Sequence, residues 1–264
     1  MAEKTIQKWV DALQASGRYT FIRAEAIRET GSHPDSVKKA LLRLVRQGRV
    51  AKVKEYFFVI VPLEYRSVGV PPASWFVHDL MAAMKLPYYV ALLSAAGLHG
   101  ASHQQPQELQ VMTHRSIRPL RAGRVRIRFF TNKQLDRMPV EDMKTPTGAM
   151  RVSTAEATAV DLVRYPKAAG QLGNIATVLS QLIPALDGRR LAAVAAKVDD
   201  VRVIQRLGYL LDQVGARRIA MPMAKTIREH DPKPVLLRPG RPATGCKTNA
   251  RWQVIVNETI EIES

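Results

Sequence analysis

Residues 32–61 combine an amphipathic basic helix with a short β-hairpin, and few folds accommodate that combination. Ser32 predicts the N-cap of the helix, and Pro34 fits its first turn. Gly48 lies just beyond the last apolar residue, where a left-handed C-terminal cap is expected. Between these ends, apolar residues recur at intervals of three and four and predict a buried face: Val37, Ala40, Leu41, Leu44 and Val45.

The segments on both sides of this helix complete the element order of a winged helix-turn-helix. Apolar spacing and turn residues predict two helices with a strand between them, and then two strands after the basic helix: 4–16, 19–22, 23–30, 49–53 and 56–61. We therefore predict a winged helix-turn-helix DNA-binding domain over residues 1–66. Such a domain places its recognition helix in the major groove and its wing beside the phosphate backbone.

The polar face of the predicted recognition helix carries side chains that suit contacts to DNA. We expect four basic residues to contact phosphates: Lys38, Lys39, Arg43 and Arg46. Three residues at the helix start are placed to reach base edges: His33, Asp35 and Ser36. The predicted wing adds Lys52 and Lys54. The alternative interpretation is a surface helix whose charges only keep it solvated, because charged side chains are mostly exposed in any protein.

The balance of charge favours a polyanionic partner. The chain of 264 residues has 40 Lys and Arg against 23 Asp and Glu, a formal net charge of +17, and such an excess points most often to nucleic acid. A membrane surface is the other option, but it needs a basic amphipathic helix with large apolar residues or a lipidation signal, and neither is convincing here. Residues 1–66 hold 13 basic and 7 acidic residues, so they account for +6 (13 − 7) and leave +11 (17 − 6) to the rest.

A second, larger domain follows a linker. Three prolines and a glycine interrupt regular structure within 62–72, and we place the linker at 67–75 and an α/β C-terminal domain at 76–264. The predicted fold class is therefore α+β. Apolar patterns in the second domain predict helices at 74–84, 87–97, 151–165, 171–183, 189–197 and 199–214, strands at 108–113, 124–130 and 252–262, and a loop at 231–249.

Arginines gather again within 115–130, where no acidic residue accompanies them. Arg124, Arg126 and Arg128 alternate with apolar residues, which is typical of a half-buried strand that shows guanidinium groups on one side. Two interpretations stay open for this strand. One is a solvated sheet face, and the other is a second strip of phosphate contacts.

The helix predicted at 151–165 starts with a capping-box pattern. Ser153 and Glu156 have the spacing at which a hydroxyl accepts from the amide three residues on and the carboxylate reaches back. We interpret both as helix-capping residues. The role of Asp161, further along the same helix, is left open.

Patterns that would indicate a metal or phosphate site are weak. His99 and His103 are four residues apart but have no acidic partner nearby, so an exposed loop is the expected setting. Residues 240–248 resemble a phosphate-binding loop, yet Cys246 separates its last glycine from the lysine. We therefore predict no catalytic residue, no metal site and no cofactor.

One pattern supports an enzymatic alternative. Asp142 and Lys144 have the D-x-K spacing of many metal-dependent nucleases, in which a carboxylate holds Mg²⁺ and a lysine supports the attacking water. Glu108 is the best placed second carboxylate. Prolines and a glycine within 136–148 predict a surface loop there, so the nuclease is the weaker hypothesis.

The expected location is a reducing compartment, the cytoplasm. Cys246 is the single cysteine, so the chain cannot form an internal disulfide. Residues 1–17 lack the apolar core of a signal peptide. The chain also lacks a run of about 18 apolar residues, the length that a membrane-spanning helix needs.

Five segments give the chain a resemblance to the AbiEi antitoxins, the antitoxins of abortive-infection E (type IV) toxin–antitoxin systems. They are the N-terminal winged helix, YYVALLSAAGLHGASHQQPQELQVMT (88–113), MRVSTAEATAVDLVRYP (150–166), QRLGYLLD (205–212) and WQVIVNETIEIE (252–263). The resemblance implies a transcriptional autoregulator whose N-terminal domain binds inverted repeats in its own promoter. It also implies a C-terminal domain linked to antitoxin activity, and a cognate nucleotidyltransferase toxin encoded alongside.

On this basis we expect a DNA-binding antitoxin and autorepressor that is not an enzyme, and that is a monomer in solution and assembles on operator DNA. The resemblance does not say whether the toxin is contacted directly. Two alternatives stay open: a metal-dependent nuclease with a DNA-binding N-terminal domain, and a ligand-responsive repressor with a pocket in its second domain.

Overall fold

The computed structural model describes residues 5–101, 107–229 and 231–261, and it has the α+β fold class that the sequence predicts. Contacts divide the chain into two compact units, each built from separate stretches. The first unit comprises Met1–Tyr89, Gln107–Lys133 and Asp142–Arg151, and the second comprises Val90–Pro106, Gln134–Glu141 and Val152–Ser264. The domain boundaries expected from the sequence stay a prediction, because these units group part of the central sheet with the N-terminal elements.

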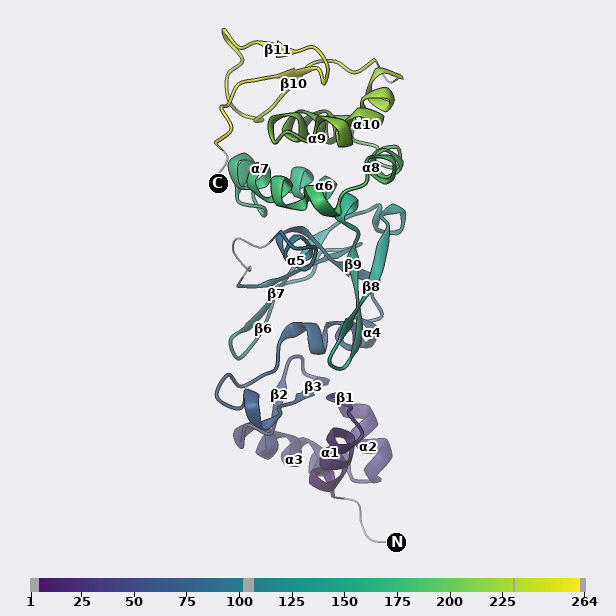
Figure 1. Cartoon of the computed structure of the whole chain (residues 1–264). Coiled ribbons are helices and arrows are strands. Elements are labelled where there is room, and N and C mark those ends of the chain that lie inside the picture. Colours follow the sequence, from purple (N-terminus) through teal and green to yellow (C-terminus); the bar gives the residue numbers. More distant parts are fainter. Residues whose placement is uncertain (1–4, 102–106, 230, 262–264) are drawn as a thin grey trace. The chain divides into compact units, whose positions relative to one another are not determined.

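The N-terminal elements follow the order expected of a winged helix-turn-helix (Figure 1). They are α1 (Ile6–Ala15), β1 (Thr20–Ile22), α2 (Arg23–Thr30), α3 (Pro34–Arg46), β2 (Val50–Lys52) and β3 (Phe57–Ile60). Strand β3 pairs antiparallel with both other strands, giving the order β1-β3-β2. Each element predicted here is present, with ends that differ only slightly from the predicted ones.

An apolar core fixes α3 within this module. The rings of Trp9 and Phe21 meet edge to face with centroids 5.1 Å apart, and Phe21 stacks on Phe58 at 5.5 Å. Three residues of α3 belong to the same core and confirm its predicted apolar face: Val37, Leu41 and Leu44. Because the core takes up this face, the opposite face of α3 is exposed.

A six-stranded sheet follows, with the strand order β6-β7-β5-β4-β9-β8. Its strands are β4 (Tyr88–Val90), β5 (Leu109–Thr113), β6 (Leu120–Ala122), β7 (Val125–Thr131), β8 (Val140–Thr145) and β9 (Gly148–Ser153). Strand β7 runs parallel to β5 and antiparallel to β6, and β4 runs parallel to β9. The shorter helical elements around the strands are η1 (Leu63–Tyr65), η2 (Ala73–Trp75), α4 (Val77–Ala83), α5 (Leu92–Leu98) and η3 (Leu135–Arg137).

The sheet corrects three expectations. The helix predicted at 87–97 is wrong in its first part, because β4 occupies Tyr88–Val90 and α5 starts only at Leu92; two aromatic residues and a β-branched one favour a buried strand. The loop predicted at 136–148 contains strand β8 at Val140–Thr145, whose partly exposed residues show no clear apolar alternation. The helix predicted at 151–165 begins only after β9 ends at Ser153.

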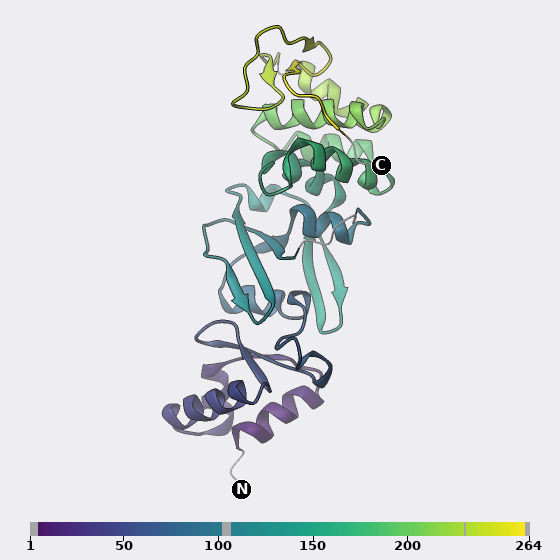
Figure 2. The same ribbon diagram turned by 90° about the vertical axis from the view of Figure 1, so that its left-hand side faces the viewer.

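Five helices of the second unit follow the sheet in the chain (Figure 2). They are α6 (Ala155–Arg164), α7 (Gln171–Leu182), α8 (Gly188–Ala195), α9 (Val201–Gln213) and α10 (Arg217–Glu229), with η4 (Ile183–Ala185) after α7. The sequence patterns did not predict α10, because Pro222 lies inside it and a proline usually ends a helix. Burial of apolar residues on both sides of the proline holds α10 together: Ala220, Met223, Ala224 and Ile227.

The last described stretch forms a small sheet in the order β10-β12-β11. These strands are β10 (Val235–Leu236), β11 (Thr248–Asn249) and β12 (Val254–Ile255), so the strand predicted at 252–262 is much shorter than expected. Trp252 is fully buried beside α9 and donates from Nε1 to Asp212 Oδ2 at 2.8 Å. Of the helices in the described ranges, none has both the length and the apolar character that crossing a bilayer requires.

Candidate nucleic-acid interface

The exposed face of α3 brings together the four residues predicted to contact phosphates. Lys39 and Arg46 lie along its middle, because residues seven apart stack two turns from one another on the same side of a helix. Lys38 and Arg43 flank this line, and all four side chains are exposed. Leu42, 44% exposed, adds an apolar spot between the cations. Such a side chain suits contact with a thymine methyl group.

The start of α3 holds the three residues predicted to reach base edges. His33 is the N-cap, and its Nδ1 accepts from the backbone N–H of Asp35 at 3.3 Å. The expectation that Ser32 caps the helix is therefore wrong by one residue, since the imidazole nitrogen supplies the acceptor. His33, Asp35 and Ser36 are all exposed, so the structure does bring the three together at one end of the helix.

The wing offers one exposed and one half-buried lysine. Lys52 Nζ lies 2.7 Å from Glu55 Oε1, and Lys54 is less exposed. The hydrogen bond and the charge of Lys52 lower the pKa of Glu55, with smaller contributions from Arg23 and Lys38. Glu55 is therefore ionised at neutral pH. It competes with phosphate for Lys52, so the α3 lysines and arginines are better placed to bind an external anion.

A second basic surface lies on the β6–β7 hairpin of the central sheet. Arg121 and Arg126 are directly opposite one another in the antiparallel register, and Arg128 lies two residues further on the same face. Ala122 and Ile127 follow these two arginines in the chain and point to the buried side, which confirms the predicted alternation. Two like charges in directly opposite positions destabilise a sheet, so the pair of Arg121 and Arg126 does not stabilise the hairpin.

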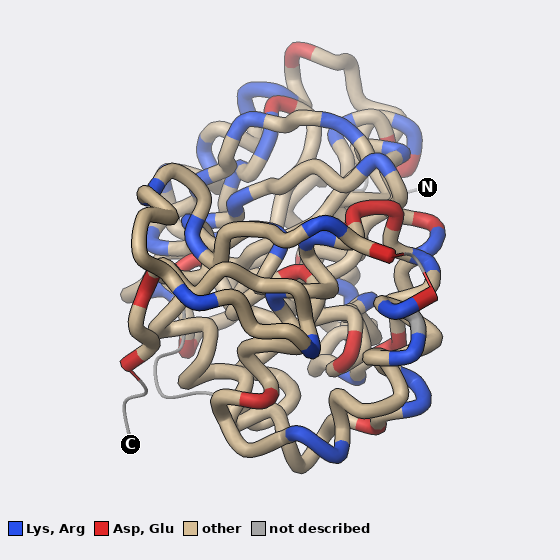
Figure 3. Tube along the Cα trace, turned by 90° about the horizontal axis from the view of Figure 1, so that it is seen from above, with Lys and Arg blue, Asp and Glu red and all other residues tan. Residues whose placement is uncertain are grey.

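The other two arginines predicted for this strip have different settings. Arg124 lies in the turn between the strands rather than on the strand and is exposed. Arg128 lies 3.4 Å from Glu108 Oε1, and its guanidinium covers the ring of Phe130 at 5.2 Å. Arg128 is therefore partly neutralised, whereas Arg121, which no prediction singled out as a contact, faces Arg126. Lys and Arg lie along much of the trace (Figure 3), as the charge outside residues 1–66 requires.

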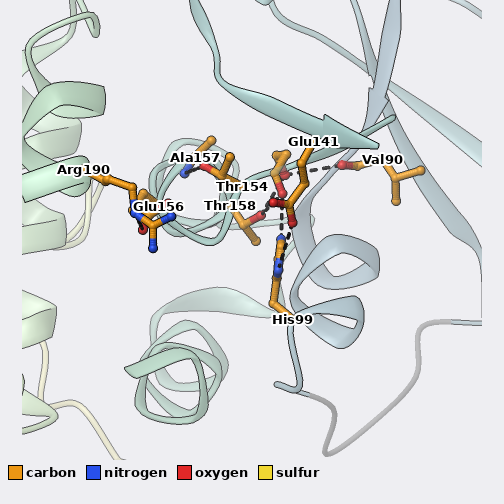
Figure 4. Close-up of polar contacts among 9 residues, drawn as sticks. Val90, His99, Glu141, Thr154, Glu156, Ala157, Thr158 and Arg190 are labelled. Carbon is orange, nitrogen blue, oxygen red and sulfur yellow. Dashed lines mark hydrogen bonds and ion pairs between the residues drawn. The ribbon is translucent and has the colours of Figure 1, made fainter. Parts of the chain in front are cut away.

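A buried polar cluster occupies the start of α6 (Figure 4). The hydroxyl of Ser153 lies 2.7 Å from the hydroxyl of Thr158 and donates to the carbonyl of Val90 at 3.3 Å. Thr154, not Ser153, is the N-cap, and it accepts from the N–H of Ala157. The capping-box interpretation of Ser153 is therefore wrong, because β9 continues through that residue and buries it.

Glu156 does not reach back to cap α6 either. Its buried carboxylate accepts from the N–H of Asp187 at 3.1 Å and lies 3.2 Å from Arg190 Nε. The carboxylate thus ties α6 to the start of α8. Asp161 is also fully buried on α6. Glu156 and Asp161 are therefore both buried inside the second unit.

His99 belongs to the same cluster and corrects another expectation. Its Nε2 donates to the carbonyl of Ser153 at 2.7 Å, and Nδ1 lies 3.7 Å from Glu141 Oε1. The side chain is only 8% exposed, so it does not lie in an exposed loop as predicted. His103, its predicted neighbour, lies outside the described residues.

The middle part of the chain is similar to a known protein family. Residues 89–213 match the family model described as AbiEi antitoxin C-terminal domain. The chain carries an AbiEi antitoxin domain. The match confirms the family resemblance that the sequence predicted, and it covers β5–β9 and α5–α9. No curated protein matches the chain at a significant level.

A solved structure shares the fold of nearly the whole chain. The "RV2827C protein from Mycobacterium tuberculosis" is 18% identical, with a TM-score of 0.63, and the alignment covers 94% of this chain and 90% of that one. At this identity the likeness concerns the fold alone. It extends beyond the AbiEi antitoxin domain to the N-terminal module and the segment after α9.

The residues of the nuclease hypothesis lie in the AbiEi antitoxin domain. Asp142 and Lys144 lie on strand β8 with exposed side chains, so the structure places them on a strand rather than in a loop. Glu108, the expected second carboxylate, lies beside Arg128. Among the described residues, no group of three His, Cys, Asp or Glu is arranged to hold a metal ion.

Sequence patterns missed several residues that matter at these surfaces. Arg121 could be recognised only once the register of β6 and β7 placed it opposite Arg126. Glu55 lies in a turn and carries no motif. Leu42 breaks the polar face of α3, and this irregularity was visible in the sequence as an apolar residue among lysines and arginines.

Proposed function

We propose that the chain is a sequence-specific DNA-binding antitoxin that represses its own toxin–antitoxin operon and neutralises a nucleotidyltransferase toxin. The AbiEi antitoxin domain supports the antitoxin role, and it belongs to a regulatory family rather than an enzymatic one. The observation that carries the DNA-binding part is the exposed face of α3. Within the described ranges, none of its four basic side chains has an ion-pair partner. Those charges are therefore available to phosphates.

Two groups of residues on α3 have different roles: one provides affinity, and the other recognises the DNA sequence. Lys38, Lys39, Arg43 and Arg46 bind phosphates, which gives affinity and sets the orientation of α3 without reading sequence. The exposed side chains at the start of α3 enter the major groove and read base edges. Inverted repeats in the promoter present two half-sites, so the protein, a monomer in solution, assembles as a pair on the operator. A promoter occupied in this way cannot bind polymerase. We expect this repression to take place in the cytoplasm.

The β6–β7 hairpin supplies the second phosphate contact. Replacing Arg121 and Arg126 with alanine is expected to weaken operator binding about tenfold and to lower the slope of log affinity against log salt by about two, because two phosphate contacts are lost. Stability should not fall, because the substitution removes a repulsive cross-strand pair. Fluorescence anisotropy over a salt series, together with thermal unfolding, measures both effects.

The charge-conserving variant is the matched control for the hairpin. Arg121→Lys combined with Arg126→Lys keeps both positive charges and should retain most of the affinity and the salt slope. Unchanged binding in the alanine variant would mean that the hairpin is only a solvated face of the sheet.

Neutralisation is tested by growth. The nucleotidyltransferase gene expected beside this one is induced in a host cell with and without the full-length chain, and growth is followed. We expect growth to stop with the toxin alone and to recover with the chain. A toxin that still arrests growth in the presence of the folded chain would contradict the antitoxin role.

A further inference from the structure

A pocket of about 920 Å³ lies in the second unit, alongside α10. Its walls are α10 from Arg217 to Arg228, the connection from α9 at Gly215 and Ala216, and the turn at Ala250 and Arg251. Apart from Ile183, the residues that line it lie beyond residue 213, where the AbiEi family match ends. The pocket therefore lies outside the proposed DNA interface and almost wholly outside the antitoxin domain.

Four guanidinium groups surround the pocket. Arg217, Arg218 and Arg228 come from α10 and are exposed, and in the described part of the chain no carboxylate pairs with them. Arg251 is held at the side by Asp212, 3.2 Å away, and by the ring of Trp252, 5.1 Å from its guanidinium carbon. All four are arginines, and a planar guanidinium fits phosphate oxygens through two parallel hydrogen bonds, which the ammonium of lysine does not.

The floor between these cations is apolar. Met221 is 60% exposed, and its neighbours on the pocket side include Ile219, Ala216 and Ala224. Arg217, Met221, Ala224 and Arg228 recur at helical spacing, so one face of α10 has a cation at each end and an apolar middle. A mostly apolar hollow with a few convergent charges, and a volume below about 1,000 Å³, is the usual form of a small-molecule site.

We infer that this pocket binds an organic phosphate of nucleotide size. The flat apolar part of the ligand lies on Met221 and the alanines, and its phosphate groups are held by Arg217, Arg218 and Arg228. A DNA duplex does not fit here, because a convex double helix would reach the arginines but leave the apolar floor uncovered. The site therefore takes a ligand different from the operator.

The test is isothermal titration calorimetry of the full chain with ATP, and with inorganic pyrophosphate and adenosine as its two halves. We expect saturable binding of ATP that weakens with salt, and at least about tenfold weaker binding of either half. Arg217→Ala combined with Arg228→Ala should weaken ATP binding about a hundredfold, because two charge-assisted contacts are lost.

Two controls separate the pocket from general charge. Lys225→Ala combined with Lys247→Ala removes the same charge from positions that do not line the pocket, and ATP affinity should stay within about twofold of the original. Met221 is exposed enough to be replaced without unfolding the helix, so Met221→Glu should abolish binding while Met221→Lys retains it. Absence of saturable ATP binding, equal affinity for ATP and pyrophosphate, or no effect of the arginine substitutions would each overturn the inference.

Discussion

Replacing Lys39 and Arg43 of α3 with alanine is expected to weaken operator binding about a hundredfold, which abolishes the shifted band in a gel assay. Both side chains are exposed on the face opposite the apolar core, so their loss removes phosphate contacts without opening a cavity. Alanine also has the highest helix propensity, so circular dichroism should show an intact helix. The slope of log affinity against log salt should fall by about two.

Two other exposed lysines provide the control for this variant. Lys8 lies on α1 and Lys197 follows α8, and replacing both with alanine removes the same net charge from positions outside the proposed interface. If binding depended only on the overall charge of the protein, the two double variants would bind equally. Operator shifts that persist after the loss of Lys39 and Arg43 would remove α3 from the interface.

The second large effect concerns stability. Gly208 lies in the middle of α9, and a Cβ added there would lie 2.2 Å from Cε3 of the fully buried Trp252. Replacing an exposed glycine within a helix by alanine usually stabilises a protein by up to about 1 kcal/mol. Here the sign is reversed, because the added methyl group collides with the indole. Gly208→Ala should therefore destabilise the protein by about 1–3 kcal/mol in chemical denaturation.

A double-mutant cycle isolates the cause of this loss. Trp252→Ala on its own should cost about 3–5 kcal/mol, since it leaves a cavity and removes the hydrogen bond from the indole Nε1 to Asp212. When Trp252 is already alanine, adding Gly208→Ala should be neutral or stabilising, because nothing remains for the methyl group to meet. A Gly208→Ala variant as stable as the original chain would show that α9 and Trp252 pack differently.

The sequence predicted the N-terminal module well because its signals are local. The spacing of Val37, Leu41 and Leu44 determines which face of α3 is buried, and therefore which residues are exposed to DNA. The N-cap was less certain, since Ser32 and His33 are adjacent and only the backbone angles select between them. Caps depend on a single hydrogen bond, so a shift of one residue leaves little trace in an apolar pattern.

Features that depend on contacts between distant residues were missed or misplaced. Ser153 and Glu156 have the spacing of a capping box, but their hydrogen bonds go to Val90 and Asp187, which no local pattern indicates. The opposition of Arg121 and Arg126 required the strand register. Helix α10 was hidden by Pro222, and the pocket beside it was missed together with the helix.

The proposed function requires that this chain reads a particular DNA sequence through α3. The most direct measurement compares the affinity of the full chain for the DNA immediately upstream of its own gene with its affinity for a shuffled duplex of the same length and composition, at about 0.15 M salt. Specific recognition predicts a preference of at least about a thousandfold for the upstream DNA. Equal affinity for both duplexes would mean that the basic faces bind DNA only through its phosphates, and would contradict sequence-specific recognition by α3.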